Sequence, residues 1–175
     1  IRMAALGLLA SYLLAAVVRA APLTEPSEVR SANGVLSAEL RAEVGRLDAG
    51  LFSFTTRTFN GTVPGPLIRF REGDEAVLRV SNTLDEDTSI HWHGIILPNG
   101  MDGVPKVNFP GIRPGETFEY RYPVEQFGTY WYHSHTDGSQ QLERGLYGSI
   151  VVDDPTDGTD YDVDEVWILD DWLLD

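Results

Sequence analysis

Glycine and proline divide this chain into short segments, and their spacing restricts the possible fold more than any other feature. The 175 residues include 17 Gly and 10 Pro. Turn sequences such as NGTVPGP, PNGMDGVP and FPGIRPGE stand between runs rich in β-branched and aromatic residues. Proline interrupts helices because it lacks a backbone N–H. Short strands separated by turns are typical of antiparallel β-sandwiches, so we predict an all-β fold of this kind.

Strands are predicted at residues 36–44, 51–59, 76–80 and 166–169, and the runs TFEYRYPV and GLYGSIVVDD are also strand-like. In the first, apolar residues at even positions alternate with polar residues at odd positions. This two-residue period gives a strand one buried face and one exposed face. A helix would place the same apolar residues on all its sides, which argues against that alternative.

All four histidines of the chain occur in two His-x-His pairs, His91 with His93 and His133 with His135. Residues two apart on a strand share one face. If the two strands are neighbours, the four imidazoles converge on one patch. The chain contains no Cys, and imidazole ligands without thiolate suit Cu, Zn, Fe or Ni. The alternative is four histidines that bind no metal.

The histidine motifs carry a resemblance to a known family. The segments HWHGIILPNGMDGVP, GTYWYHSHTDG and GLYGSIVV are similar to the first cupredoxin domain of multicopper oxidases, which include laccases and ferroxidases. The segment VPKVNFPGI contains no Cys, and in this respect the chain is similar to the bacterial copper-resistance and laccase-like branch. The resemblance extends from about Gly34 to Asp175 and implies a Greek-key β-sandwich of cupredoxin type, with the beginning of a second such domain.

The resemblance also implies a role for each candidate site residue. By position, His91 corresponds to a ligand of the type 2 copper of a trinuclear cluster. His93 and His133 correspond to ligands of one type 3 copper, and His135 to a ligand of the other. Asp102 corresponds to an acid that helps to deliver protons during oxygen reduction. Its local alternative is a turn residue, because Asp-Gly is a common turn sequence.

The domain organisation follows from composition together with the resemblance. The uncharged run at residues 3–18, followed by small residues, predicts an export signal at 1–20. We expect a tether at 21–33, the first cupredoxin-like domain at 34–152, an acidic linker at 153–159 and the truncated start of a second such domain at 160–175. The protein would then be exported, to the periplasm or beyond the cell.

Charge excludes some partners. There are 13 basic and 27 acidic residues, which give a formal net charge of −14. A nucleic-acid partner is not expected, because a phosphate backbone requires clustered Lys and Arg. The uncharged run is also short for a membrane span of about 20 residues, so no stable membrane span is expected.

The family's cluster takes as many histidines again from the last domain, which also carries a type 1 copper bound by Cys. The resemblance therefore implies the N-terminal part of an oxidase, inactive by itself, that needs further cupredoxin domains or another subunit. Such enzymes couple one-electron oxidation of phenols, cuprous ion or ferrous ion to the four-electron reduction of oxygen to water. Two alternatives remain: an exported copper-binding protein without catalysis, and a β-sandwich with a structural zinc ion.

Overall fold

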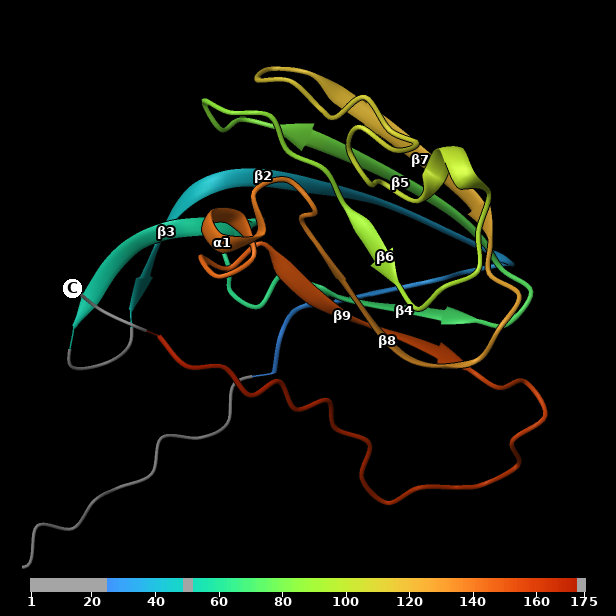
Figure 1. Ribbon diagram of the computed structural model, residues 1–175. Helices are drawn as coiled ribbons and strands as arrows, with labels where there is room; N and C mark the ends of the chain where they lie inside the picture. The colour runs from blue at the N-terminus through green and yellow to red at the C-terminus, as the bar shows by residue number, and fades with distance from the viewer. Residues whose placement is uncertain (1–24, 49–51, 173–175) are drawn as a thin grey trace, which may run out of the picture.

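Two β-sheets packed face to face form the body of the protein (Figure 1). The computed structural model describes residues 25–48 and 52–172. The first sheet, here called the histidine sheet, has the strand order β1-β4-β9-β8-β6. Its strands are β1 (Glu28–Arg30), β4 (Leu67–Arg71), β9 (Tyr147–Asp153), β8 (Gly128–His133) and β6 (His91–His93).

The opposite sheet has the order β3-β2-β5-β7. Its strands are β3 (Ser53–Phe59), β2 (Val35–Asp48), β5 (Glu75–Asn82) and β7 (Thr117–Pro123). Helical structure in the described part of the chain is limited to η1 (Asn99–Met101) and α1 (Gly138–Gln141). The predicted all-β sandwich is thus confirmed.

The core lies between the two sheets and is rich in aromatic residues. Trp92 from the histidine sheet is fully buried and packs against Tyr120 of β7, with ring centroids 5.2 Å apart. Tyr132 of β8 lies on the same side, 5.9 Å from Trp92. Both residues neighbour histidines in sequence, so their burial directs the histidine side chains to the outer face of the sheet.

The predicted antiparallel pairing is wrong in part, because both sheets are mixed. β2 pairs with β5 in parallel, and β4 is parallel to both β1 and β9. The chain crosses from the opposite sheet to the histidine sheet between β3 and β4, and returns between β4 and β5. β3, β4 and β5 are consecutive in the sequence but do not pair with one another, so a short turn does not determine their neighbours.

Two local predictions also require correction. Residues 28–30, assigned from the sequence to the tether, form β1 and pair with β4, so regular structure begins earlier than expected. Residues 166–169, a predicted strand, form none. A strand requires a partner for its backbone groups, and no strand among the described residues pairs with this segment. The predicted export signal lies outside the described residues.

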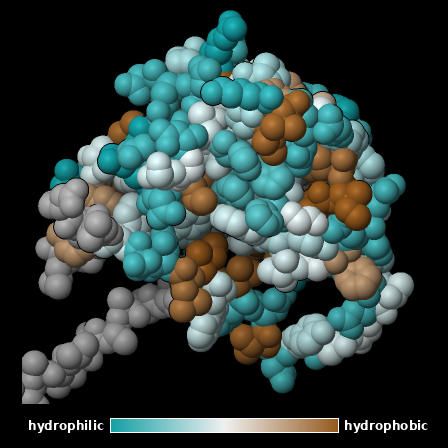
Figure 2. Space-filling model, viewed as in Figure 1, coloured by the Kyte–Doolittle hydropathy of each residue, from teal (hydrophilic) through white to brown (hydrophobic). Residues whose placement is uncertain are grey.

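Residues 154–172, here called the C-terminal segment, run beside the histidine sheet without helix or strand (Figure 1). Arg69 of β4 pairs with Asp164 in this segment, and Trp172 packs against Phe54 with ring centroids 4.9 Å apart. Several of its hydrophobic residues are exposed, Trp167 by 70% and Leu169 by 89%. Figure 2 shows hydrophobic patches on an otherwise mostly hydrophilic face. Among the described residues, no helix is long and apolar enough to cross a membrane.

Candidate metal centre

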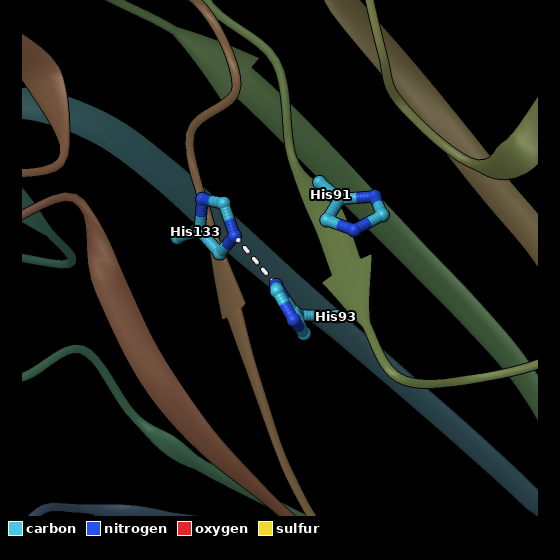
Figure 3. A group of neighbouring side chains, drawn as sticks. All are labelled: His91, His93 and His133. Atoms are coloured by element: carbon cyan, nitrogen blue, oxygen red, sulfur yellow. Dashed lines mark hydrogen bonds between the residues drawn. The ribbon is translucent and has the colours of Figure 1, made fainter. Parts of the chain in front are cut away.

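The two histidine-bearing strands are neighbours, as the predicted convergence requires. β6 and β8 pair antiparallel, with His91 opposite His133 and His93 opposite Trp131. β8 ends at His133, and His135 follows in the turn beyond it. Ser134 is buried and His135 is exposed. Figure 3 shows the rings of His91, His93 and His133 grouped together.

All four imidazoles lie within ring-contact distance of a neighbour. The ring centroid of His91 is 5.4 Å from that of His93, 5.5 Å from that of His133 and 5.4 Å from that of His135. In the triad His91, His93 and His133, one nitrogen from each ring lies within 4.8 Å of the others. His135 is not part of this triad, but its ring lies 6.1 Å from that of His133. The structure therefore brings together all four predicted histidines.

One pair of nitrogens already has the separation of two ligands on a single metal ion. Nδ1 of His93 and Nε2 of His133 are 3.2 Å apart, and a dashed line joins these two atoms in Figure 3. With metal–nitrogen bonds of about 2.0–2.1 Å, this separation corresponds to an angle of about 100° at the metal, close to tetrahedral. The residues present fit a transition-metal ion.

Asp102 lies against His91. Nδ1 of His91 is 2.9 Å from the backbone oxygen of Asp102 and 3.2 Å from its carboxylate Oδ1. A carbonyl oxygen can only accept, so Nδ1 carries the proton and Nε2 keeps the lone pair that a metal requires. Such partners orient metal-binding histidines. Asp102 thus lies beside His91.

His133 is the most buried of the four histidines, with 7% of its surface exposed. Its Nδ1 donates to the backbone oxygen of Ser134 over 2.8 Å, which leaves the lone pair on Nε2. The pKa of His133 is lowered from 6.5 to about 4, chiefly by burial and to a smaller extent by the neighbouring histidines, while the Ser134 hydrogen bond acts in the opposite direction. The ring is therefore neutral, as metal binding requires, over most of the pH range.

Trp131 and Asn108 also contact the centre, and the sequence alone did not indicate a role for Asn108. Trp131 contacts two of the histidines, with its ring centroid 4.1 Å from that of His133 and 4.9 Å from that of His93. Asn108 Nδ2 donates to Asp102 Oδ2 over 3.1 Å, on the side of the carboxylate that does not face His91. Asn108 lies in a turn, where amide residues are common, so its type alone gave no signal.

Comparisons with known proteins agree on one family. Residues 49–157 match the family model for multicopper oxidases. The copper resistance protein A homolog of Pseudomonas syringae pv. tomato is 54% identical over 120 residues, which cover 67% of this chain and 20% of that protein. Multicopper oxidase MmcO of Mycobacterium tuberculosis is 43% identical over 159 residues, covering 91% of this chain and 30% of the relative.

Solved structures give the same result. The multicopper oxidase from Campylobacter jejuni, described as a metallo-oxidase, superposes with a TM-score of 0.69 at 33% identity, covering 77% of this chain and 30% of that one. The chain therefore spans only about a fifth to a third of the length of these relatives.

Proposed function

Because this chain belongs to the multicopper oxidase family, we propose that it contributes the histidine ligands on one side of a copper centre in an oxidase. Copper is the metal that the family implies, and the grouped imidazoles are ligands that suit it. The observation that carries the proposal is the 3.2 Å approach of His93 Nδ1 to His133 Nε2, made by two strands paired side by side. We propose these two nitrogens as ligands of one type 3 copper.

His91 and His135 complete this set of proposed ligands. We assign His91 to a type 2 copper and His135 to the second type 3 copper. Each ring is within 5.4 to 6.1 Å of another histidine, a spacing that favours several adjacent ions over one ion. When bound, copper supplies the one-electron redox changes that allow oxygen to be reduced to water. The chain itself holds the imidazoles and keeps their lone pairs available.

Asp102 is proposed to hold His91 and to pass protons at the centre. Its Oδ1 faces His91 and its Oδ2 accepts from Asn108, so the carboxylate is fixed by two neighbours. In the full-length enzyme, Asp102→Asn should change the pH dependence of oxygen uptake. An unchanged pH profile would leave Asp102 only its role in orienting His91.

The remaining ligands would come from further cupredoxin domains or from another subunit. Supporting this proposal, the chain covers a fifth to a third of its relatives, and it contains no Cys for a type 1 copper. The reducing substrate would meet the domain that carries the type 1 copper, and phenols, cuprous ion and ferrous ion are the candidate classes. We also propose export from the cytoplasm, on the basis of the predicted signal at residues 1–20.

Two measurements test the proposed function. We expect the coding sequence to continue into a His-Cys-His segment. We also expect the full-length product to be blue and to consume oxygen with one of these substrates. A stop codon after Asp175 and a copper-loaded product without oxygen uptake would instead support the non-catalytic copper-binding alternative. Native protein that contains zinc alone would support the structural zinc alternative.

A further inference from the structure

Gln141, the last residue of α1, is fully buried although glutamine usually lies at protein surfaces. Its Oε1 accepts hydrogen bonds from Thr88 Oγ1 over 2.8 Å and from Ser134 Oγ over 2.7 Å. Its Nε2 donates to the backbone oxygen of Asp87 over 2.8 Å. Both lone pairs of the oxygen are used, so the side-chain amide has a single well-defined position.

The partners of Gln141 belong to the two segments that carry the histidines. Asp87 and Thr88 lie just before β6 and therefore just before His91. Ser134 stands between His133 and His135. One buried amide thus connects the approach to the first histidine pair with the middle of the second pair. The β6–β8 ladder is a second connection between these segments.

That second connection stops short of His135. The last paired residue of β8 is His133, so among the described residues His135 itself has no partner in the sheet ladders. Its backbone N–H donates instead to Ser89 Oγ over 3.1 Å, and Ser89 Oγ also accepts from Thr136 Oγ1 over 3.1 Å. Ser134 Oγ, which donates to Gln141, accepts from the backbone N–H of Thr136 over 3.1 Å. The turn that carries His135 is therefore held by the side-chain hydroxyls of Ser89 and Ser134 in addition to the backbone bond from Ser134 N–H to the oxygen of Leu146 over 2.9 Å. Gln141 fixes one of these hydroxyls.

We infer that Gln141 is a positioning residue for the copper centre: it holds the turn 134–136 at a fixed place relative to β6, so that His135 is placed before any metal binds. This inference rests on the proposed function only in treating the histidines as metal ligands. Replacing a residue that orients a metal ligand without touching the metal typically lowers metal affinity by about 10- to 100-fold.

The main variant is Gln141→Met, which keeps the length of the side chain but removes every hydrogen bond of its amide. The matched control is Asn82→Leu. Asn82 is a second buried amide with three backbone partners, Glu86, Ile112 and Leu84, and it contacts neither histidine pair. Both variants lose a buried amide and its hydrogen bonds, so a loss of stability alone should affect them equally. If Gln141→Met does not fold, Ser134→Ala removes one bond of the same set.

Two measurements are made on the 175-residue chain. Hydrogen exchange of the His135 amide in metal-free protein should become at least 10-fold faster in Gln141→Met, and should change less than 3-fold in Asn82→Leu. Copper affinity, measured against a competing chelator, should fall 10- to 100-fold in Gln141→Met and stay within about 3-fold of wild type in Asn82→Leu.

Unchanged exchange at His135 in Gln141→Met, or equal effects in the two variants, would overturn the inference. The exchange experiment needs no metal. If the wild-type chain failed to bind copper, the proposed function would fail, and the exchange rates would still decide whether Gln141 positions His135.

Discussion

At the scale of single residues, the centre depends on which nitrogen of each imidazole carries the proton. His91 and His133 both donate from Nδ1 to a backbone oxygen, of Asp102 and Ser134 respectively. Backbone oxygens cannot donate, so this choice of tautomer is independent of pH as long as the rings are neutral. The lone pairs on Nε2 are then available to a metal.

The first prediction concerns Asp102. Asp102→Asn removes the carboxylate from His91 but leaves the backbone oxygen that accepts from Nδ1. We therefore expect copper affinity of the chain to fall by only about 10-fold, the lower end of the range for such partners. Competition titration with a chelator measures this, with Asp85→Asn as the control, because Asp85 is an exposed acid in the bend at residues 84–86. A loss as large as that of His91→Ala would contradict the orienting role of the backbone oxygen.

The second prediction concerns pH. The pKa of His133 is about 4 in the folded chain and 6.5 when unperturbed, so between these values the unfolded state binds the additional proton. The free energy of unfolding should therefore fall as pH decreases from about 6.5 to 4, by at most about 3 kcal/mol. Urea denaturation of metal-free protein across this range measures it. His133→Gln should have a shallower dependence, and an equally steep one would exclude His133 as the cause.

At the scale of elements, β6 is short and needs support from the loop that carries Asp102. Gly103 has a φ of +71°, and a Cβ atom at this position would lie 1.7 Å from the backbone oxygen of Ile90, just before β6. Only glycine allows the loop to approach the strand this closely. The same approach brings Asp102 to His91.

Gly103→Ala should therefore destabilise the chain by at least about 3 kcal/mol, because it combines a steric clash with an unfavourable φ. Gly100→Ala is the matched control, since a Cβ there would meet nothing within 4 Å and its φ is not in the left-handed region. Its free energy of unfolding should change by less than about 1 kcal/mol. Similar values for the two variants in urea denaturation would contradict the close approach.

At the scale of the whole molecule, the histidines come from two segments, at β6 and at the end of β8, and the chain between them passes through β7 in the opposite sheet. Trp92 and Tyr132 anchor the two strands in the core from the opposite face, so the centre is available only when the sandwich is folded. A ligand that binds only the folded state stabilises it by mass action.

Copper at 100 times its dissociation constant should therefore raise the free energy of unfolding by about 2.7 kcal/mol. Denaturation with and without copper measures this shift. The double variant His93→Ala, His133→Ala should lose most of it. An equal shift in that variant would place the stabilising copper elsewhere.

The sequence by itself determined the β class and the face on which each histidine lies. Both depend on local physics: turn residues interrupt helices, and side chains alternate along a strand. It also placed Asp102 near the histidines through its resemblance to a family.

Only the tertiary structure decided which strands are neighbours. Parallel pairing of β2 with β5, the inclusion of β1 and the absence of a strand at residues 166–169 all depend on which backbone groups meet in space. Alternation identifies the face of a strand but not its partner. The roles of Gln141 and of the Asp102 backbone oxygen could not be predicted for the same reason. Gln141 acts through hydrogen bonds to residues distant in the sequence, and a backbone oxygen is present in every residue, so the residue type does not indicate its role.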